Sequence, residues 1–319
     1  MDDILIFATH RREIIEFKAA FEKKFEIDDI GECKRIIGID VERHKDGSVC
    51  ISQRTFIRDL IERYGQADCN GQTTPMNNSV ELCCGSDDCG NCQMADAREY
   101  RAIIGRLLYI AGTSRPDIAY AVSSLSRFNS KAHVIHMKAA IRVVQYLKTT
   151  QGLSIRYRKT GLPLFGHSDA EWANCKLDRK SYSGSVIILA GAPVSWEARK
   201  QLTIALSSTE AEYVAMGSAV KEILFCQQIL EELGLEESSR GPTELFVDNK
   251  SSINLASRIG YSARTKHIDV KHHFIRELVE NGRVRILHVR SEENLADVCT
   301  KGLGPIKHKA AVQSMLYGG

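Results

Sequence analysis

The sequence predicts an α/β fold whose second half is a mixed five-stranded sheet flanked by helices. Three strand-like apolar runs follow one another closely, at 162–169, 183–189 and 193–200. Amphipathic stretches then alternate with two further apolar runs, at 244–248 and 284–289. A three-stranded meander followed by alternating helices and strands builds a mixed sheet with helices on its faces. The expected helices span 208–233, 250–258, 266–281 and 295–302.

Length and composition set the class of protein. The 319 residues allow two domains at roughly 150 residues each. Net charge is +3, from 43 basic and 40 acidic residues. Any binding of nucleic acid must therefore come from local basic patches rather than from an overall basic surface. The chain shows no 18-residue apolar run and no secretory signal, which predicts neither membrane insertion nor secretion. Ten scattered cysteines suit a reducing compartment.

The N-terminal part reads as short strands and amphipathic helices. Two acids, Asp2 and Asp3, precede a strand-like run at Ile4–Phe7. Helical periodicity at 11–25 and at 56–64 predicts two helices. Between them, Ile36–Arg43 and Val49–Gln53 read as a hairpin across a Lys-Asp-Gly-Ser turn. We expect these elements to serve packing.

The stretch 70–96 is polar, contains glycine and has few large apolar residues, so we interpret it as a linker and as the first target of a protease. It holds Cys83, Cys84, Cys89 and Cys92. The Cys89-x-x-Cys92 pair has the spacing of half a zinc site. Four thiols within ten residues leave little chain to wrap a tetrahedral metal. We therefore interpret them as incidental loop cysteines.

Three helices are expected next, over 100–111, 118–128 and 133–149, with Pro116 placed where a first helical turn tolerates it. This block is rich in basic side chains, and two interpretations stay open. The basic residues either form ordinary solvated surface or follow the backbone of a nucleic-acid duplex. They are Arg106, Arg115, Arg127, Lys138, Arg142 and Lys148.

Four acids occur at the ends and starts of the elements expected after residue 161. Asp169 and Asp248 end strands, Asp297 begins a helix, and Glu210 or Glu212 lies in the first turn of another. Each alone fits a turn or helix-start role, but together they can gather at one edge of the sheet. Carboxylates that cannot neutralise one another need a cation. Two Mg²⁺ ions about 4 Å apart, with Mn²⁺ as a substitute, fit the set and serve phosphodiester hydrolysis.

The choice between the two glutamates follows from helix geometry. Residues two apart lie about 200° apart on a helix, so both cannot share one target. Glu212 falls on one face with Ala215, Met216 and Ala219, the face expected to meet the sheet. Glu212 is the predicted ligand, and Glu210 remains the alternative, with a role in compensating the helix dipole.

Seven short motifs follow one another along the second half of the chain. They are Asp169–Trp172, Asp178–Ser181, Leu206–Tyr213, Val247–Asn249, Arg264–Asp269, His273–Glu277 and Ala296–Lys301. In this order they resemble the ribonuclease H domain of copia-type LTR retrotransposons, and the Glu-x-x-Ala at 212–215 also resembles ribonucleases H in general. Seven collinear matches are far more specific than any one of them, and the resemblance extends upstream to residue 1.

The resemblance implies a domain order. It gives the C-terminal part of a reverse transcriptase palm at 1–69, a variable linker at 70–96, a helical thumb or connection at 97–150, a ribonuclease H-like domain at 161–303 and a C-terminal tail at 304–319. Asp2 and Asp3 resemble the end of the palm's paired-aspartate hairpin, whose chemistry needs a third aspartate from an earlier strand. No residue precedes Met1, so we expect relic acids and no DNA synthesis by this chain alone.

The resemblance also implies an activity and its residues: endonucleolytic cleavage of the RNA strand of RNA/DNA hybrids, with Asp169, Glu212, Asp248 and Asp297 as catalytic metal ligands. Candidate phosphate contacts are Arg179, Lys180 and Lys266, and candidate sensors of the 2′-hydroxyl are Asn174, Ser208 and Asn249. The implied partners are a hybrid duplex and the rest of a Pol polyprotein. The implied location is the cytoplasm, inside virus-like particles with access to the nucleus. Oligomeric state stays open.

Histidines mark one departure from the family. The mobile histidine that assists product release in many ribonucleases H has no counterpart in Val289–Asn294, and His288 is expected to pack within its strand. His267, His272 and His273 lack the spacing of a zinc pair. Two other functions remain open: a domesticated copy that grips duplexes without cutting, and a different nuclease or transposase on the same fold.

Overall fold

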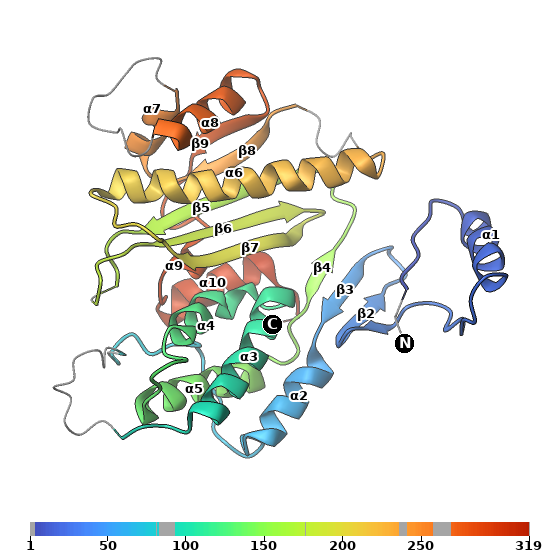
Figure 1. Ribbon diagram of the computed structural model, residues 1–319, viewed down its shortest axis with the longest axis horizontal. Helices are drawn as coiled ribbons and strands as arrows, with labels where there is room; N and C mark the ends of the chain where they lie inside the picture. The colour runs from blue at the N-terminus through green and yellow to red at the C-terminus, as the bar shows by residue number, and fades with distance from the viewer. Residues whose placement is uncertain are drawn as a thin grey trace.

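The computed structural model describes residues 4–80, 82, 93–175, 177–235, 241–257 and 269–318, with only the backbone at 257 and 269–272. Several predicted features therefore lie outside the described residues. They are Asp2, Asp3, the four linker cysteines, Lys266 and His267, together with the side chain of His272. The described chain forms two sheets and a block of helices (Figure 1).

The first sheet is antiparallel, in the order β1-β2-β3-β4: β1 Arg35–Ile36, β2 Ile39–Arg43, β3 Val49–Ser52 and β4 Ile155–Tyr157. The predicted hairpin forms, but a turn splits its first strand. Ile37 and Gly38 both have positive φ, 42° and 79°. Glycine adopts this conformation freely, but the apolar β-branched residues around it predict a continuous strand. The strand β4 was not predicted, because three residues carry no readable period.

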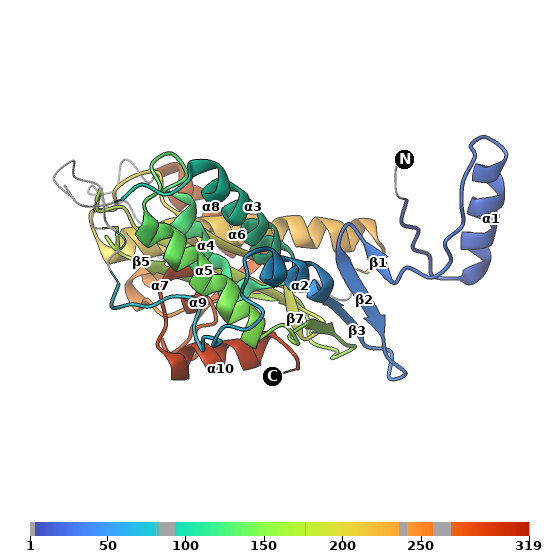
Figure 2. The ribbon, with the colours of Figure 1, turned by 90° about the horizontal axis from the view of Figure 1, so that it is seen from below.

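The N-terminal segment differs most from expectation. The run Ile4–Phe7, predicted as a strand, is irregular. A strand needs a neighbour for its backbone N–H and C=O groups, and no described strand pairs with it. Helix α1, Arg11–Glu22, forms as predicted but buries no residue. It stands away from the rest of the chain (Figures 1 and 2).

The helical block confirms the predicted helices. Fully buried side chains such as Ile103, Leu107, Val122 and Leu147 join them in one core. Asp96 caps the longest helix of this block, Ala97–Thr113, by accepting hydrogen bonds from the backbone N–H groups of residues 98 and 99. The elements are α2 Arg54–Arg63, α3 Ala97–Thr113, the 3₁₀ turn η1 Pro116–Ile118, α4 Ala119–Ser126 and α5 Val134–Thr149.

The second sheet confirms the predicted five-stranded mixed architecture. Its order is β7-β6-β5-β8-β9. The first three strands pair antiparallel, whereas β8 runs parallel to both β5 and β9. The carboxyl ends of β5 and β8 consequently reach the same edge. The strands are β5 Phe165–Glu171, β6 Tyr182–Leu189, β7 Ala192–Lys200, β8 Thr243–Val247 and β9 Val284–His288.

Helices cover both faces of this sheet. Helix α6, Ser208–Glu232, lies across one face (Figure 1), where Met216 and Val220 share a core with Ile187 and Leu245. Helices α7, Lys250–Ser257, and α8, Asp269–Glu280, extend that layer. The opposite face packs on α9, Asp297–Thr300, on α10, Pro305–Met315, and on the start of α4. The helical block and the second sheet therefore share a core.

The segment 304–319 was predicted as a tail and instead forms helix α10. The structure buries His308, Val312 and Met315 on it, whereas Ile306 is 88 % exposed. A buried histidine and an exposed isoleucine hide the amphipathic period that predicts a helix. Among the described residues, no helix is both long and apolar enough to span a bilayer. The six described cysteines are free thiols.

Candidate functional site

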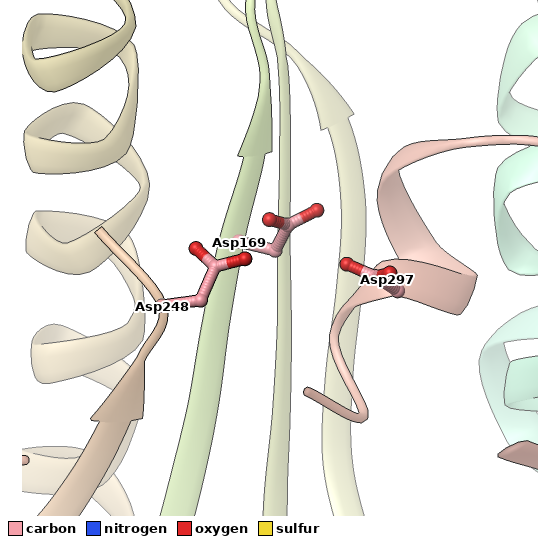
Figure 3. Close-up of side chains that lie close together, drawn as sticks. All are labelled: Asp169, Asp248 and Asp297. Carbon is pink, nitrogen blue, oxygen red and sulfur yellow. The ribbon is translucent and has the colours of Figure 1, made fainter. Parts of the chain in front are cut away.

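Three aspartates converge at one edge of the second sheet. Asp169 lies near the end of β5, Asp248 directly follows β8, and Asp297 begins α9. Each offers a carboxylate oxygen, and these oxygens all lie within 4.8 Å of one another (Figure 3). The parallel register that pairs Ser168 with Val247 brings the first two acids side by side.

The third aspartate depends on a glycine. Gly184 on β6 pairs with Asp169 in the sheet. A Cβ atom at Gly184 would lie 2.6 Å from the Thr300 side chain and 2.9 Å from the Ala296 carbonyl oxygen. Only a residue without a side chain lets α9 approach this closely, and that approach carries Asp297 to the site.

Glu212 is the buried glutamate of α6. It is 5 % exposed, it accepts a hydrogen bond from the backbone of Ala170, and its Oε2 has no hydrogen-bond partner among the described residues. Burial, then the charges of Asp169 and Asp248, raise the pKa of Glu212 to about 9. Two residues earlier, Glu210 points elsewhere: its carboxylate accepts from the backbone N–H of Leu206 at 2.8 Å. The structure thus places Glu212, and not Glu210, against the aspartates.

Asp297 is 6 % exposed, and its carboxylate also resists ionisation. Burial and the charge of Asp169 raise the pKa of Asp297 to about 7, although the ammonium of Lys301 opposes the shift. Carboxylates that are hard to ionise together indicate a site where negative charge exceeds positive charge.

Three polar side chains hold the aspartates in place, and sequence reasoning missed all three. The Thr300 hydroxyl donates to Asp169, and the Ser291 hydroxyl donates to Asp248 Oδ2 at 2.7 Å. The Asn294 amide donates to the carbonyl oxygen of Ser168 at 3.0 Å, which ties the loop before α9 to β5. Thr300 falls inside a recognised motif, but no pattern in the sequence points to Ser291.

Lys301 and Glu171 were also missed. The Lys301 ammonium lies 2.9 Å from Asp297 Oδ1, 3.4 Å from Asp169 Oδ2 and 3.7 Å from Glu171 Oε2. Strand alternation could have revealed Glu171, because residues two apart on a strand share a face and Asp169 lies two positions earlier. Burial, opposed by Lys301, raises the pKa of Glu171.

Comparison with known proteins identifies the family. A family model described as reverse transcriptase (RNA-dependent DNA polymerase) matches residues 1–78. The chain is 32 % identical over 225 residues to the putative transposon Ty5-1 protein of Saccharomyces cerevisiae, covering 70 % of this chain and 72 % of that protein. The chain belongs to the copia-type retrotransposon Pol polyproteins.

Longer relatives show what part of such a polyprotein this is. The chain is 33 % identical over 307 residues to the "Retrovirus-related Pol polyprotein from transposon TNT 1-94" of Nicotiana tabacum, with 94 % of this chain and 23 % of that protein covered. For the transposon RE1 Pol polyprotein of Arabidopsis thaliana the values are 35 % identity over 304 residues, 95 % and 20 %. The Pol segment thus spans about a fifth of these relatives.

Solved structures similar to the Pol segment include ribonucleases H. One is a ribonuclease H1 isolated from compost, with 15 % identity, a TM-score of 0.34, and coverage of 43 % of this chain and 92 % of that one. Another is a foamy viral protease-reverse transcriptase in complex with double-stranded DNA, with 12 % identity, a TM-score of 0.35, and coverage of 61 % and 32 %.

The predicted substrate contacts of the Pol segment differ in exposure and in hydrogen-bond partners. Arg179 is exposed in a tight loop and Lys180 is half-buried beside it. Ser208 is exposed at the first position of α6, the helix that carries Glu212. Asn249, next to Asp248, uses its side-chain oxygen to cap α7 by accepting from the backbone of residue 252. Asn174 instead donates to the Tyr120 hydroxyl of α4 at 3.0 Å, so the helical block reaches the site's margin.

The basic helical face does not form as one surface. Arg115 is 1 % exposed and pairs with Asp117 inside the fold. Arg142 donates to the Thr74 hydroxyl and Lys148 donates to the Cys69 carbonyl, so both side chains bind the segment 69–74. The prediction for His288 is wrong, because that residue is exposed at the end of β9 rather than packed. Burial is a tertiary property, and basic composition alone did not reveal it.

Proposed function

We propose that this Pol segment is a ribonuclease H-type endonuclease that uses two divalent cations to cut the RNA strand of RNA/DNA hybrids. The observation that carries the proposal is the convergence of Asp169, Asp248 and Asp297 within 4.8 Å, with the buried carboxylate of Glu212 beside them. A set of acids gathered from four separate elements, at a cost in charge repulsion, fits a cation site better than a structural role.

The donor set fits Mg²⁺ or Mn²⁺. Both ions prefer carboxylate oxygens, and Glu212 supplies a buried oxygen that no described residue satisfies. Divalent cations held here supply the two electrostatic contributions that phosphodiester hydrolysis needs: a lower pKa for the attacking water and stabilisation of charge on the leaving oxygen.

The chain's own residues have distinct roles in this proposal. The acids Asp169, Glu212, Asp248 and Asp297 hold the cations, while the hydroxyls of Thr300 and Ser291 orient two of the carboxylates. We assign phosphate contacts to Arg179 and Lys180, in the loop after β5, and a minor-groove contact to Ser208, which is exposed at the start of α6.

The setting of the activity is reverse transcription. A Pol polyprotein that copies RNA into DNA generates RNA/DNA hybrids, and an RNA-degrading activity in the same polypeptide removes the template. We propose that the rest of the polyprotein and the hybrid are the partners of this segment, and that it acts in cytoplasmic particles.

The test is cleavage of a 5′-labelled RNA/DNA hybrid by the purified chain, in Mg²⁺ and in EDTA. We expect cuts within the RNA strand only in Mg²⁺, and none in matched DNA/DNA or RNA/RNA duplexes. Asp248→Asn and Glu212→Gln should each reduce cleavage by orders of magnitude, because each removes a cation ligand. The matched control is Glu210→Gln, which changes the same side chain two residues away and should cleave like the wild type.

Two results would count against the proposal. Wild-type rates for Asp248→Asn would remove the carboxylates from the mechanism. Tight hybrid binding by the wild type without any cleavage would favour the alternative, a copy that grips duplexes and does not cut. Loss of cleavage in Glu210→Gln but not in Glu212→Gln would reassign the glutamate.

A further inference from the structure

The charge balance of the carboxylate edge, which Asp169, Glu212, Asp248 and Asp297 form, points to Lys301. Among the described residues, the ion pairs to these acids all come from its side chain. Lys301 follows the last residue of α9 in extended conformation, with φ −146° and ψ 158°. Its side chain is 30 % exposed, whereas those of its partners Asp169 and Asp297 are 3 % and 9 % exposed.

We propose that Lys301 is the internal counter-cation of this site: its ammonium neutralises Asp169 and Asp297 in the metal-free chain and competes with divalent cations for the same oxygens. The inference rests on the proposed function, because it requires that the site takes divalent cations. Lys301 acts as a positioning residue, and no contact with substrate is assigned to it.

The geometry differs from that of an ordinary surface ion pair. Lys301 meets carboxylates from two separate elements, β5 and α9, and two of these are nearly inaccessible to water. A buried acid without a counter-charge is costly, so a resident ammonium lowers the cost of assembling the site before any metal arrives.

Glu171 is an alternative ion-pair partner for the Lys301 ammonium. Its Oε2 lies 3.7 Å from Lys301 Nζ, and its side chain is 38 % exposed. Glu171 lies outside the group of converging carboxylates, which consists of Asp169, Asp248 and Asp297. When cations occupy the aspartate oxygens, the lysine can keep this outer partner, so displacement of its ammonium leaves no buried charge unpaired.

The test measures cation binding directly, without activity. Wild type, Lys301→Met and Lys301→Arg are titrated with MnCl₂ by calorimetry at one fixed pH, and each is melted in EDTA. The matched control is Lys200→Met, because Lys200 is 21 % exposed and pairs with a single acid, Asp178, at 2.7 Å.

We expect Lys301→Met to melt at a lower temperature than the wild type in EDTA and to bind Mn²⁺ about tenfold more tightly, since a positive charge a few ångströms from the cation is removed. Lys301→Arg keeps the charge and should restore both wild-type values. Lys200→Met should lower the melting temperature without changing Mn²⁺ affinity.

The outcomes separate the two proposals. No Mn²⁺ binding by the wild type would overturn the proposed function itself. Wild-type binding with unchanged affinity in Lys301→Met would overturn only the counter-cation. Weaker binding by Lys301→Met would also overturn it, because it would mean that the lysine orients the acids rather than competes for them. If Lys301→Met folds only when Mn²⁺ is added, the counter-cation is supported, and Lys301→Arg then supplies the affinity comparison.

Discussion

Two buried clusters of charged side chains in this chain differ in charge balance: one pairs opposite charges, and the other gathers acids. In the helical block, Arg115 Nη2 lies 2.7 Å from Asp117 Oδ2, and both side chains are at most 1 % exposed. The Tyr146 hydroxyl donates to the same carboxylate at 2.6 Å, and Arg115 also donates to the carbonyl of Thr150. Burial opposes both charges, yet their mutual attraction raises the pKa of Arg115 and lowers that of Asp117.

The carboxylate edge is the unbalanced counterpart. Three aspartates and Glu212 lie together here, and among the described residues Lys301 supplies the ion pairs to Asp169 and Asp297. The pKa values of Glu212 and Asp297 are raised rather than lowered. The comparison shows how to separate structural from functional burial of charge. A balanced cluster with satisfied hydrogen bonds joins elements of the fold, whereas an excess of one sign marks a place for a ligand of the other sign.

The strongest test of the comparison exchanges one acid for its amide in each cluster. Asp117→Asn leaves the buried Arg115 without its partner and should cost about 3–5 kcal/mol of unfolding free energy. Asp248→Asn removes like-charge repulsion and should leave metal-free stability unchanged or higher. Urea denaturation in EDTA measures both. Equal losses in the two variants would mean that the carboxylate edge is also a structural cluster.

A second prediction concerns helix α10, which joins the two regions. His308 Nε2 lies 3.1 Å from the carbonyl oxygen of Asp117, and Met315 is 3 % exposed in the shared core. Met315→Ala should cost about 2–5 kcal/mol. Ile306→Ala, on the same helix at an 88 % exposed position, should stay within about 0.5 kcal/mol. Similar melting temperatures for the two variants would show that 304–319 behaves as the tail the sequence predicted.

A third prediction uses pH. The pKa of Glu212 rises from 4.5 to about 9 in the folded chain, so the folded state resists ionisation that the unfolded state accepts. Metal-free stability should therefore be greatest below pH 4.5 as far as this group is concerned, and fall as the pH rises toward 9. Melting curves in EDTA should show a decline that Glu212→Gln flattens. Mg²⁺ should reduce the same decline, because a bound cation stabilises the ionised acids. A wild-type profile as flat as that of Glu212→Gln would contradict the burial of this charge.

The smallest expected effect is at Ser291. Its hydroxyl is exposed and donates to Asp248 Oδ2, so Ser291→Ala should change stability by less than about 0.5 kcal/mol. Metal affinity should nevertheless fall by about tenfold, because the carboxylate loses a fixed orientation. Mn²⁺ titration measures it, with Ser314→Ala on α10 as the control, because the Ser314 hydroxyl donates to the carbonyl of Ala310 in its own helix. A loss of stability without a loss of affinity would assign Ser291 a purely structural role.

Sequence reasoning succeeded where local periodicity carries the information. All five strands of the second sheet and its long helices formed near their predicted positions, because strand and helix periods reflect which side is buried. It failed for elements that are short, or whose sequence shows no clear period, and that depend on contacts with residues far away in the chain. Strand β4 exists because it pairs with β3, about a hundred residues earlier in the chain, and α10 is buried through contacts that its own period does not display.

The sequence by itself determined which acids this protein offers, the order of these acids along the chain, and the family to which the protein belongs. It also favoured Glu212 over Glu210, because a helical period decides which of two neighbouring side chains faces a sheet. Only the tertiary structure decided how these charges are held. Thr300 reaches Asp169 across 131 positions of sequence, and Lys301 meets Asp169 only because Gly184 admits α9 to the sheet. Such contacts follow from strand pairing and close packing over long separations, and local sequence periods carry no record of them.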